Sequence, residues 1–256
     1  MLGVDMCRIA ALSVFRPVRL ESVMEYFFLP PMPDTYNRDG WGLVCYMGDD
    51  CLLIKEPAYA RESILLRAVI DGGRLKGCQA LFHVRKATKG GVTFANTHPF
   101  VKRMWGMCWA FAHHGDGDWP TESFPGPFQP VGRTDAEAIF CWMLNELWRA
   151  FGDRAPPWRV IVPKVWELVC RLWRDSRKIN FVLCVPSLML AFYGGHESMY
   201  YCHHILEGSD AFLVSSTPLP FTSGWVSFNP GELKVVKKGS IQEGLWDPFS
   251  QRGLLE

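Results

Sequence analysis

The chain has 256 residues, with 27 Lys and Arg against 26 Asp and Glu and a formal net charge of +1. Hydrophobic residues make up 48% and charged residues 21%, which is typical of a globular chain that buries a sizeable core. The balanced charge argues against nucleic-acid binding by bulk electrostatics. The first residues also lack the basic flank and long apolar block of a signal peptide.

The first half of the chain is predicted to be rich in strands. Strand-like segments occupy residues 7–15, 40–47, 51–56 and 80–87, and turn residues lie between them. Residues 60–70 have helical spacing, and residues 106–119 predict a buried strand that runs into a Gly/Asp turn.

Two helices are expected in the middle of the chain. The clearer one covers residues 133–152, with a Thr134–Glu137 capping-box pattern at its start and Gly152 near its end. A second helix is expected over residues 164–176. Five strand candidates follow, at residues 181–185, 188–193, 199–202, 211–215 and 233–237.

This order of strands, helices and further strands is not a regular βαβ alternation, which disfavours a Rossmann-type sheet. Two stacked sheets with helices outside fit the order better. The proline-rich residues 120–132 are interpreted as a surface loop before the long helix, so no domain boundary is expected there.

The nine cysteines favour a reducing environment. Their number is odd, no pair has CxxC spacing, and most lie in apolar runs such as WGLVCYM (residues 41–47). A free cysteine in such a run behaves as a small hydrophobic side chain. We therefore expect a cytoplasmic protein without a disulfide framework or a structural zinc site.

Cys7 follows a second methionine, Met6, and this suggests a chemical role. A thiol has an ordinary pKa of roughly 8.5 and an α-amine one of roughly 8, so an N-terminal cysteine contains a nucleophile and a matched base. This chemistry requires residues 1–6 to be absent, because the nitrogen of a peptide bond has no useful basicity. The alternative is an ordinary buried strand cysteine.

Four other stretches bear on that choice: NRDGWGLVCY (residues 37–46), HVRKATKGGVTFANTHPF (83–100), WAFAHHGDGDW (109–119) and GRTDAEAIFCWML (132–144). In this order after Met6-Cys7, the chain resembles the class II glutamine amidotransferases, and more closely their stand-alone members. These are N-terminal nucleophile hydrolases that begin at a catalytic cysteine. The resemblance implies an α+β fold, a four-layer αββα sandwich, with residues 1–6 as a candidate leader and residues 7–256 as a single domain.

The resemblance also implies substrate-binding residues. Arg85 would hold the α-carboxylate of glutamine through its planar fork, and Asp135 would accept the α-ammonium. Asp135 is equally suited to the first turn of a helix, where it complements the dipole. Thr88 would add a hydroxyl group, or is a simple turn residue. His98 lies near the pocket in the family, or is a satisfied core histidine.

The expected oxyanion hole departs from the family pattern. The usual His-Asn-Gly is His113-His114-Gly115 here. Gly115 keeps its N–H, whereas the His114 ring replaces an asparagine amide with a different reach. Losing one such donor typically costs about a hundred- to a thousandfold in rate. Lys86 and Lys89 also stand where better-known members often carry other residues.

The same stretches allow two further interpretations. In NRDGWG, Asp39 or Arg38 could orient the N-terminal amine region, or the segment is a plain turn. The string HHGDGD could suggest a metal site, but strand alternation would turn His113 and His114 to opposite faces. We therefore expect no metal.

The sequence thus predicts cleavage of a γ-glutamyl amide, by default glutamine to glutamate and ammonia, through a Cys7 thioester. Cys7, Gly115 and His114 would be the catalytic residues, and no cofactor, nucleic acid or membrane would be involved. Ammonia would pass to a partner protein, or the chain would hydrolyse another γ-glutamyl compound. The alternative is a non-catalytic homologue that binds a γ-glutamyl ligand or a partner protein.

Overall fold

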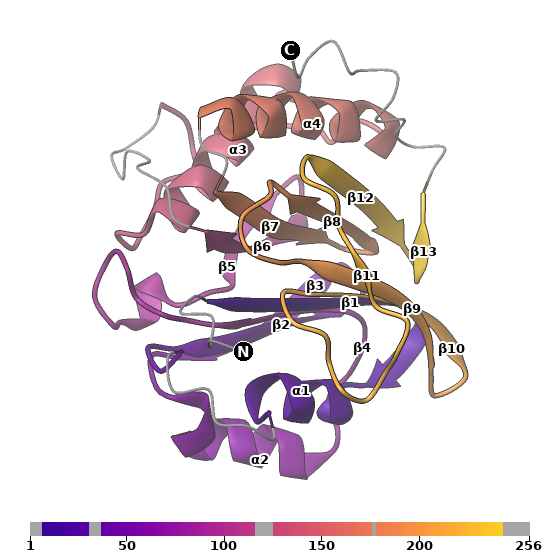
Figure 1. The fold of residues 1–256 in the computed structure, drawn as a ribbon. Coiled ribbons are helices and arrows are strands. Elements are labelled where there is room, and N and C mark those ends of the chain that lie inside the picture. Colours follow the sequence, from indigo (N-terminus) through magenta and orange to yellow (C-terminus); the bar gives the residue numbers. More distant parts are fainter. Residues whose placement is uncertain (1–6, 31–36, 116–124, 176–177, 243–256) are drawn as a thin grey trace.

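The structure is a computed structural model that describes residues 7–30, 37–115, 125–175 and 178–242. Its centre is a pair of stacked sheets, both antiparallel throughout, with two helices on each outer face (Figure 1). This is a four-layer αββα sandwich, as the sequence predicts.

The larger sheet contains seven strands in the order β11 (Val226–Ser227), β9 (Tyr200–Leu206), β10 (Ser209–Ser215), β1 (Arg8–Arg19), β4 (Lys76–Val84), β2 (Trp41–Met47) and β3 (Asp50–Glu56). The smaller sheet contains β13 (Ser240–Ile241), β12 (Glu232–Lys237), β8 (Leu188–Tyr193), β7 (Ile179–Val185), β6 (Met107–Gly115) and β5 (Phe100–Met104). The first strand of the chain therefore lies inside its sheet, between β10 and β4.

Each layer boundary is a separate hydrophobic core. The helices α1 (Glu21–Phe28) and α2 (Ile64–Gly72) pack on the outer face of the larger sheet. The helices α3 (Asp135–Phe151) and α4 (Trp158–Asp175) cover the smaller sheet. The third core lies between the two sheets.

Strand β6 shows how one sequence serves two of these cores. Trp109 and Phe111 point toward α3 and α4, whereas Ala110 and Ala112 point into the gap between the sheets. Successive side chains of a strand alternate between its faces, so both faces are apolar when both are buried.

The predicted strands and the three predicted helical segments are present, with shifted ends. Helix α4 begins at Trp158 and includes Pro163, whereas the sequence pattern predicts a helix that begins after this proline. Because Pro163 is in the second turn, only one early N–H bond is lost. Local patterns do not predict α1, which is only eight residues long, or the short strands β5, β11 and β13.

Part of the predicted loop and turn lies outside the described residues, namely residues 116–119 and 120–124. Residues 125–132 form neither helix nor strand. All nine cysteines are free thiols. No helix in the described ranges is both long and apolar enough to cross a bilayer.

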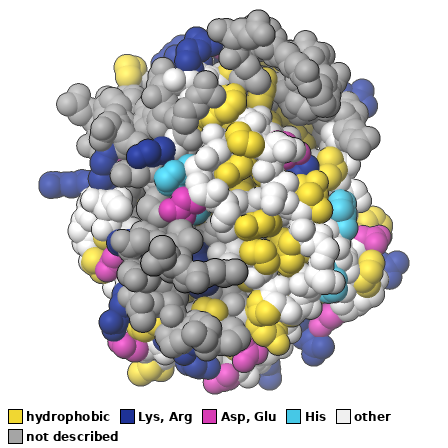
Figure 2. Space-filling view, in the orientation of Figure 1, with side chains coloured by type: hydrophobic (Ala, Val, Ile, Leu, Met, Phe, Trp, Pro, Cys, Tyr) yellow, Lys and Arg dark blue, Asp and Glu magenta, His cyan; other side chains and the backbone are white. Residues whose placement is uncertain are grey.

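The face shown in Figure 2 carries a band of hydrophobic side chains down its middle, with most charged side chains toward its margins. Val226 on β11 and Ile205 on β9 are among the exposed apolar residues of the chain.

The core beneath α3 gives a stability prediction. Phe111 is fully buried and stacks on Phe140, with ring centroids 5.2 Å apart. We expect Phe111→Ala to lower the free energy of unfolding by about 3–5 kcal/mol, because it leaves a cavity and removes the ring contact. Denaturant titration measures the loss. The matched control is Ile205→Ala, at a side chain that is 58% exposed, and an equal loss there would contradict the assignment of this core.

Candidate active site

A small cavity lies where β1 begins. It is lined by Cys7, Arg85, Lys86, Thr88, Lys89, His98, His113, Gly115, Thr134, Asp135 and Ala136. Six of the seven residues predicted from the sequence are in this list, and the exception is His114. The cavity volume is about 20 Å³. That is room for roughly one water molecule, so the cavity must enlarge to admit an amino acid.

The thiol of Cys7 is held by the backbone of a single residue. The Lys86 N–H donates to Cys7 Sγ at 3.2 Å, and Sγ lies 3.4 Å from the Lys86 carbonyl oxygen, to which it donates. Burial of the thiol raises its pKa to about 11, although the Lys86 N–H and the nearby Arg85 charge oppose the rise. Near neutral pH the side chain is therefore a protonated thiol, which is a poor nucleophile.

Arg85 follows β4 and organises the loop after it. Its side chain is buried, and its guanidinium donates to the carbonyl oxygens of Gly91 at 3.0 Å, Lys89 at 2.8 Å and Gly90 at 3.3 Å. A guanidinium has five N–H donors, so at least two are not used by these bonds. Arg85 thus shapes the 86–91 loop and can still donate to a ligand.

The 37–42 segment holds the 86–91 loop and Arg85 through hydrogen bonds. Asp39 Oδ2 accepts the Ala87 N–H at 2.8 Å, and the Asp39 N–H donates to the Arg85 carbonyl at 3.0 Å. A Cβ at Gly42 would lie 2.3 Å from the His98 carbonyl oxygen. The 37–42 segment and the backbone at His98 therefore approach too closely for any side chain at residue 42. Arg38 instead contacts Glu62 and Tyr59, and its side chain is 55% exposed.

The start of α3 delivers Asp135 to the cavity. Thr134 caps the helix, because its hydroxyl oxygen accepts the Glu137 N–H at 3.2 Å. Asp135 is the first helical residue, and its Oδ1 accepts the Ala136 N–H at 2.8 Å. The partly positive end of the helix dipole favours a carboxylate at this position.

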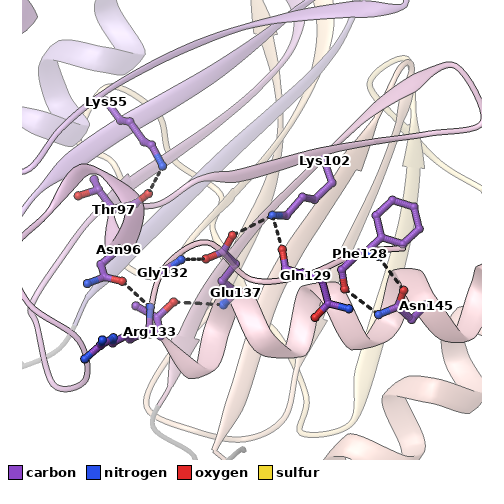
Figure 3. Close-up of polar contacts among 11 residues, drawn as sticks. Lys55, Asn96, Thr97, Lys102, Phe128, Gln129, Gly132, Arg133, Glu137 and Asn145 are labelled. Carbon is purple, nitrogen blue, oxygen red and sulfur yellow. Dashed lines mark hydrogen bonds and ion pairs between the residues drawn. The ribbon is translucent and has the colours of Figure 1, made fainter. Parts of the chain in front are cut away.

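Only half of the predicted capping box forms. The Glu137 carboxylate accepts the Gly132 N–H at 2.7 Å and pairs with Lys102 at 3.0 Å, rather than returning to Thr134 (Figure 3). Figure 3 also shows Asn96 Oδ1 accepting the Arg133 N–H at 2.7 Å. These contacts fix the turn before α3, and with it the position of Asp135.

His98 lies on the far wall against a second histidine. Its ring stacks on that of His83, with centroids 4.1 Å apart, and both side chains are buried. Burial keeps both pKa values well below their ordinary range, so both rings are neutral. Neither ring nitrogen of His98 has a hydrogen-bond partner within the described residues, and His98 can therefore donate to or accept from a ligand.

The end of β6 separates His113 from His114, as strand alternation predicts. His113 and Gly115 share the face that lines the cavity, and a Cβ at Gly115 would lie 2.0 Å from the Lys178 carbonyl. His114 Nε2 instead lies 3.4 Å from Glu197 Oε2. His113 was not among the predicted site residues, although its two-residue spacing from Gly115 could have indicated it.

The HHGDGD string at this strand end also bears on the alternative metal site. Among the residues that the structure describes, no group of three or more His, Cys, Asp or Glu side chains is placed to hold a metal ion. Asp116 and Asp118 of the HHGDGD string lie outside the described residues.

Comparisons with known proteins agree with this fold. A family model of the class II glutamine amidotransferases matches residues 6–207, and the chain belongs to this family. It is 37% identical over 160 residues to the provisionally named glutamine amidotransferase YafJ of Escherichia coli. That match covers 61% of this chain but only 60% of YafJ, less than two thirds of its length.

A provisionally named glutamine amidotransferase of Haemophilus influenzae is 28% identical over 253 residues, which cover 91% of this chain and 85% of that protein. Among solved structures, one from Pseudomonas aeruginosa that was provisionally identified as a glutamine amidotransferase has a TM-score of 0.65 at 23% identity. It covers 93% of this chain and 96% of that one. Glutamine phosphoribosylpyrophosphate amidotransferase of B. subtilis has a TM-score of 0.60 at 15% identity, over 92% of this chain and 48% of that one. These structural likenesses establish the fold.

The buried thiol predicts how Cys7 reacts in the chain that retains residues 1–6. Alkylation requires the thiolate, and the Cys7 pKa is raised to about 11. We expect the alkylation rate to rise about tenfold per pH unit above neutrality and to level off only near pH 11. Peptide mass mapping after timed exposure to iodoacetamide gives the rate at each pH. A plateau below pH 9 would contradict burial of this thiol.

Proposed function

We propose that the chain cleaves a γ-glutamyl amide, by default glutamine, through a thioester on Cys7. One observation carries the proposal. Cys7, Arg85, Gly115 and Asp135 come from four distant segments and line one cavity. A nucleophile, a cation, a backbone N–H and an anion are the groups needed to attack a side-chain amide while holding an α-carboxylate and an α-ammonium.

The base in this proposal is the α-amine that Cys7 gains when residues 1–6 are removed. An α-amine has a pKa of roughly 7.7–8.0, so it is free to accept the thiol proton near neutral pH. A thiol whose pKa is about 11 needs such a base, since it does not ionise by itself. While Cys7 is acylated at nitrogen by Met6, this base does not exist.

The reaction then has two balanced halves. The thiolate adds to the side-chain carbonyl, the amine returns its proton to the departing nitrogen, and ammonia leaves as the thioester forms. Water adds to the thioester, a proton passes to the sulfur, and glutamate is released. Gly115 N–H stabilises the oxyanion in both halves. His114 remains the predicted second donor, and its ring, which lies beside Glu197, would turn toward the cavity to donate.

Substrate recognition follows from the same cavity. The N–H groups that Arg85 does not use on the 86–91 loop would bind the α-carboxylate, and Asp135 would bind the α-ammonium. Thr88 and His98 also line the cavity and would complete the hydrogen bonds of these groups. Ammonia would go to a partner protein, or a different γ-glutamyl compound would be hydrolysed outright.

A non-catalytic homologue is the second candidate function. One observation favours it: the Cys7 thiol exchanges hydrogen bonds with the Lys86 backbone and is held protonated. Such a protein would bind glutamine without turnover and would keep residues 1–6.

The intact mass of the purified chain tests the proposal, before and after exposure to a diazoketone analogue of glutamine. We expect a chain that begins at Cys7 and gains one adduct, because the free amine activates the thiol. Cys7→Ser should abolish the adduct, whereas Cys51→Ser, at another partly exposed cysteine, should retain it. A chain that keeps residues 1–6, gains no adduct and yet binds glutamine would establish the non-catalytic alternative.

The departure at residue 114 gives a second test. If the His114 ring is a poor replacement for an asparagine amide, His114→Asn should raise kcat for glutamine hydrolysis by tenfold or more, toward the value of about a hundred- to a thousandfold that one donor typically contributes. An ammonia-release assay measures kcat. A steep fall would show instead that His114, beside Glu197, has a role of its own.

A further inference from the structure

A second and much larger cavity, of about 430 Å³, lies at the opposite end of the sandwich. It is formed by the second half of β1, the β2–β3 turn, the start of β4, and the β7–β8 and β12–β13 turns. Val14 in its wall is seven residues along β1 from Cys7. At a rise of about 3.3 Å per residue, the two cavities are roughly 23 Å apart. A volume of this size is within the usual range of roughly 300–1,000 Å³ for sites that bind small molecules.

The walls of this distal cavity are mainly apolar. Val14 and Pro186 are buried. The ring of Tyr46 is fixed in place, because its hydroxyl donates to the Cys184 carbonyl at 2.7 Å. Phe15 and Met47 stand at the rim and are 54% and 62% exposed. A flat apolar body placed in the cavity would bury these two side chains, which have no cover within the described residues.

One buried polar group in the wall lacks a partner. The side chain of Gln79 is 1% exposed, and its Nε2 donates to the Val185 carbonyl at 2.8 Å and the Leu188 carbonyl at 3.2 Å. Its Oε1 accepts no hydrogen bond from the described residues. Leaving such an acceptor buried and unpaired is unfavourable, so a ligand that carries an N–H or O–H donor would relieve this cost.

The charged groups of the cavity favour an anion. Lys76 and Lys238 line it against a single carboxylate, that of Asp49. Lys76 also lies near Glu207, whereas Lys238 is in no ion pair within the residues that the structure covers. Lys238 therefore has a charge that is available to a ligand.

We propose that this distal cavity binds a small organic anion with an aromatic or branched apolar body and one N–H or O–H donor. The apolar body would lie on Phe15, Met47 and Tyr46. The anionic group would face Lys238. The donor would bond to Gln79 Oε1, which has almost no accessible surface until the amide turns toward the cavity. The site is independent of Cys7 and of the function proposed above.

Anilinonaphthalene sulfonate is a suitable probe, because it combines an aromatic body, one N–H donor and a sulfonate. We expect saturable, one-site fluorescence with the full chain. Lys238→Glu should raise the Kd of the probe at least tenfold. Lys237→Glu, at the neighbouring lysine outside the cavity, should change that Kd less than twofold. Gln79→Met should also raise the Kd of the probe, and an unchanged Kd would overturn the role given to Gln79.

Protection of Cys78 locates the bound probe. Cys78 lines the cavity and is partly exposed, whereas Cys51 is partly exposed elsewhere. Saturating probe should slow alkylation of Cys78 at least fivefold and leave alkylation of Cys51 unchanged, as followed by peptide mass mapping. Absence of saturable fluorescence, equal affinity in the two lysine variants, or unprotected Cys78 would each overturn the proposal.

Discussion

The position of β1 inside its sheet is the constraint on which the candidate active site depends. Because β1 pairs with β10 on one side and β4 on the other, its first residues are fixed by two ladders of backbone hydrogen bonds. Arg8 lies opposite Val84, so Cys7 is necessarily beside the residues that leave β4. This register brings the thiol to the Lys86 backbone and to the loop that Arg85 organises.

The smaller sheet and α3 supply the other side of the candidate active site. The ring of His83, on β4, lies 3.2 Å from the carbonyl oxygen of His113, on β6, which joins the two sheets next to the cavity. Gly115 follows on the same strand, and the turn held by Asn96 and Glu137 sets Asp135 opposite. The cavity is thus a junction of both sheets and α3, and no single layer could form it.

The same sandwich is open at its other end, where hairpin turns rather than α3 meet. Polar and charged residues of this end are held by the framework: Gln79 bridges from β4 to the β7–β8 turn, and Ser13 accepts the Gly239 N–H at 3.2 Å. The two ends differ in what they bury. One encloses a thiol and charged groups in little space, and the other leaves a wide apolar cavity.

The sequence by itself determined the elements with strong patterns and the family. Alternating or continuous apolar runs identified the long strands, Thr134 located the start of α3, and the ordered stretches around Cys7, Arg85 and Asp135 identified the family. Only the tertiary structure decided which side chains meet. It placed His113 rather than His114 on the cavity wall, turned Arg38 away to Glu62, and used Glu137 to hold a turn instead of completing the capping box. These outcomes depend on which face of a strand is covered and on contacts between residues far apart in the chain. A local pattern of residues predicts neither the covered face of a strand nor such long-range contacts.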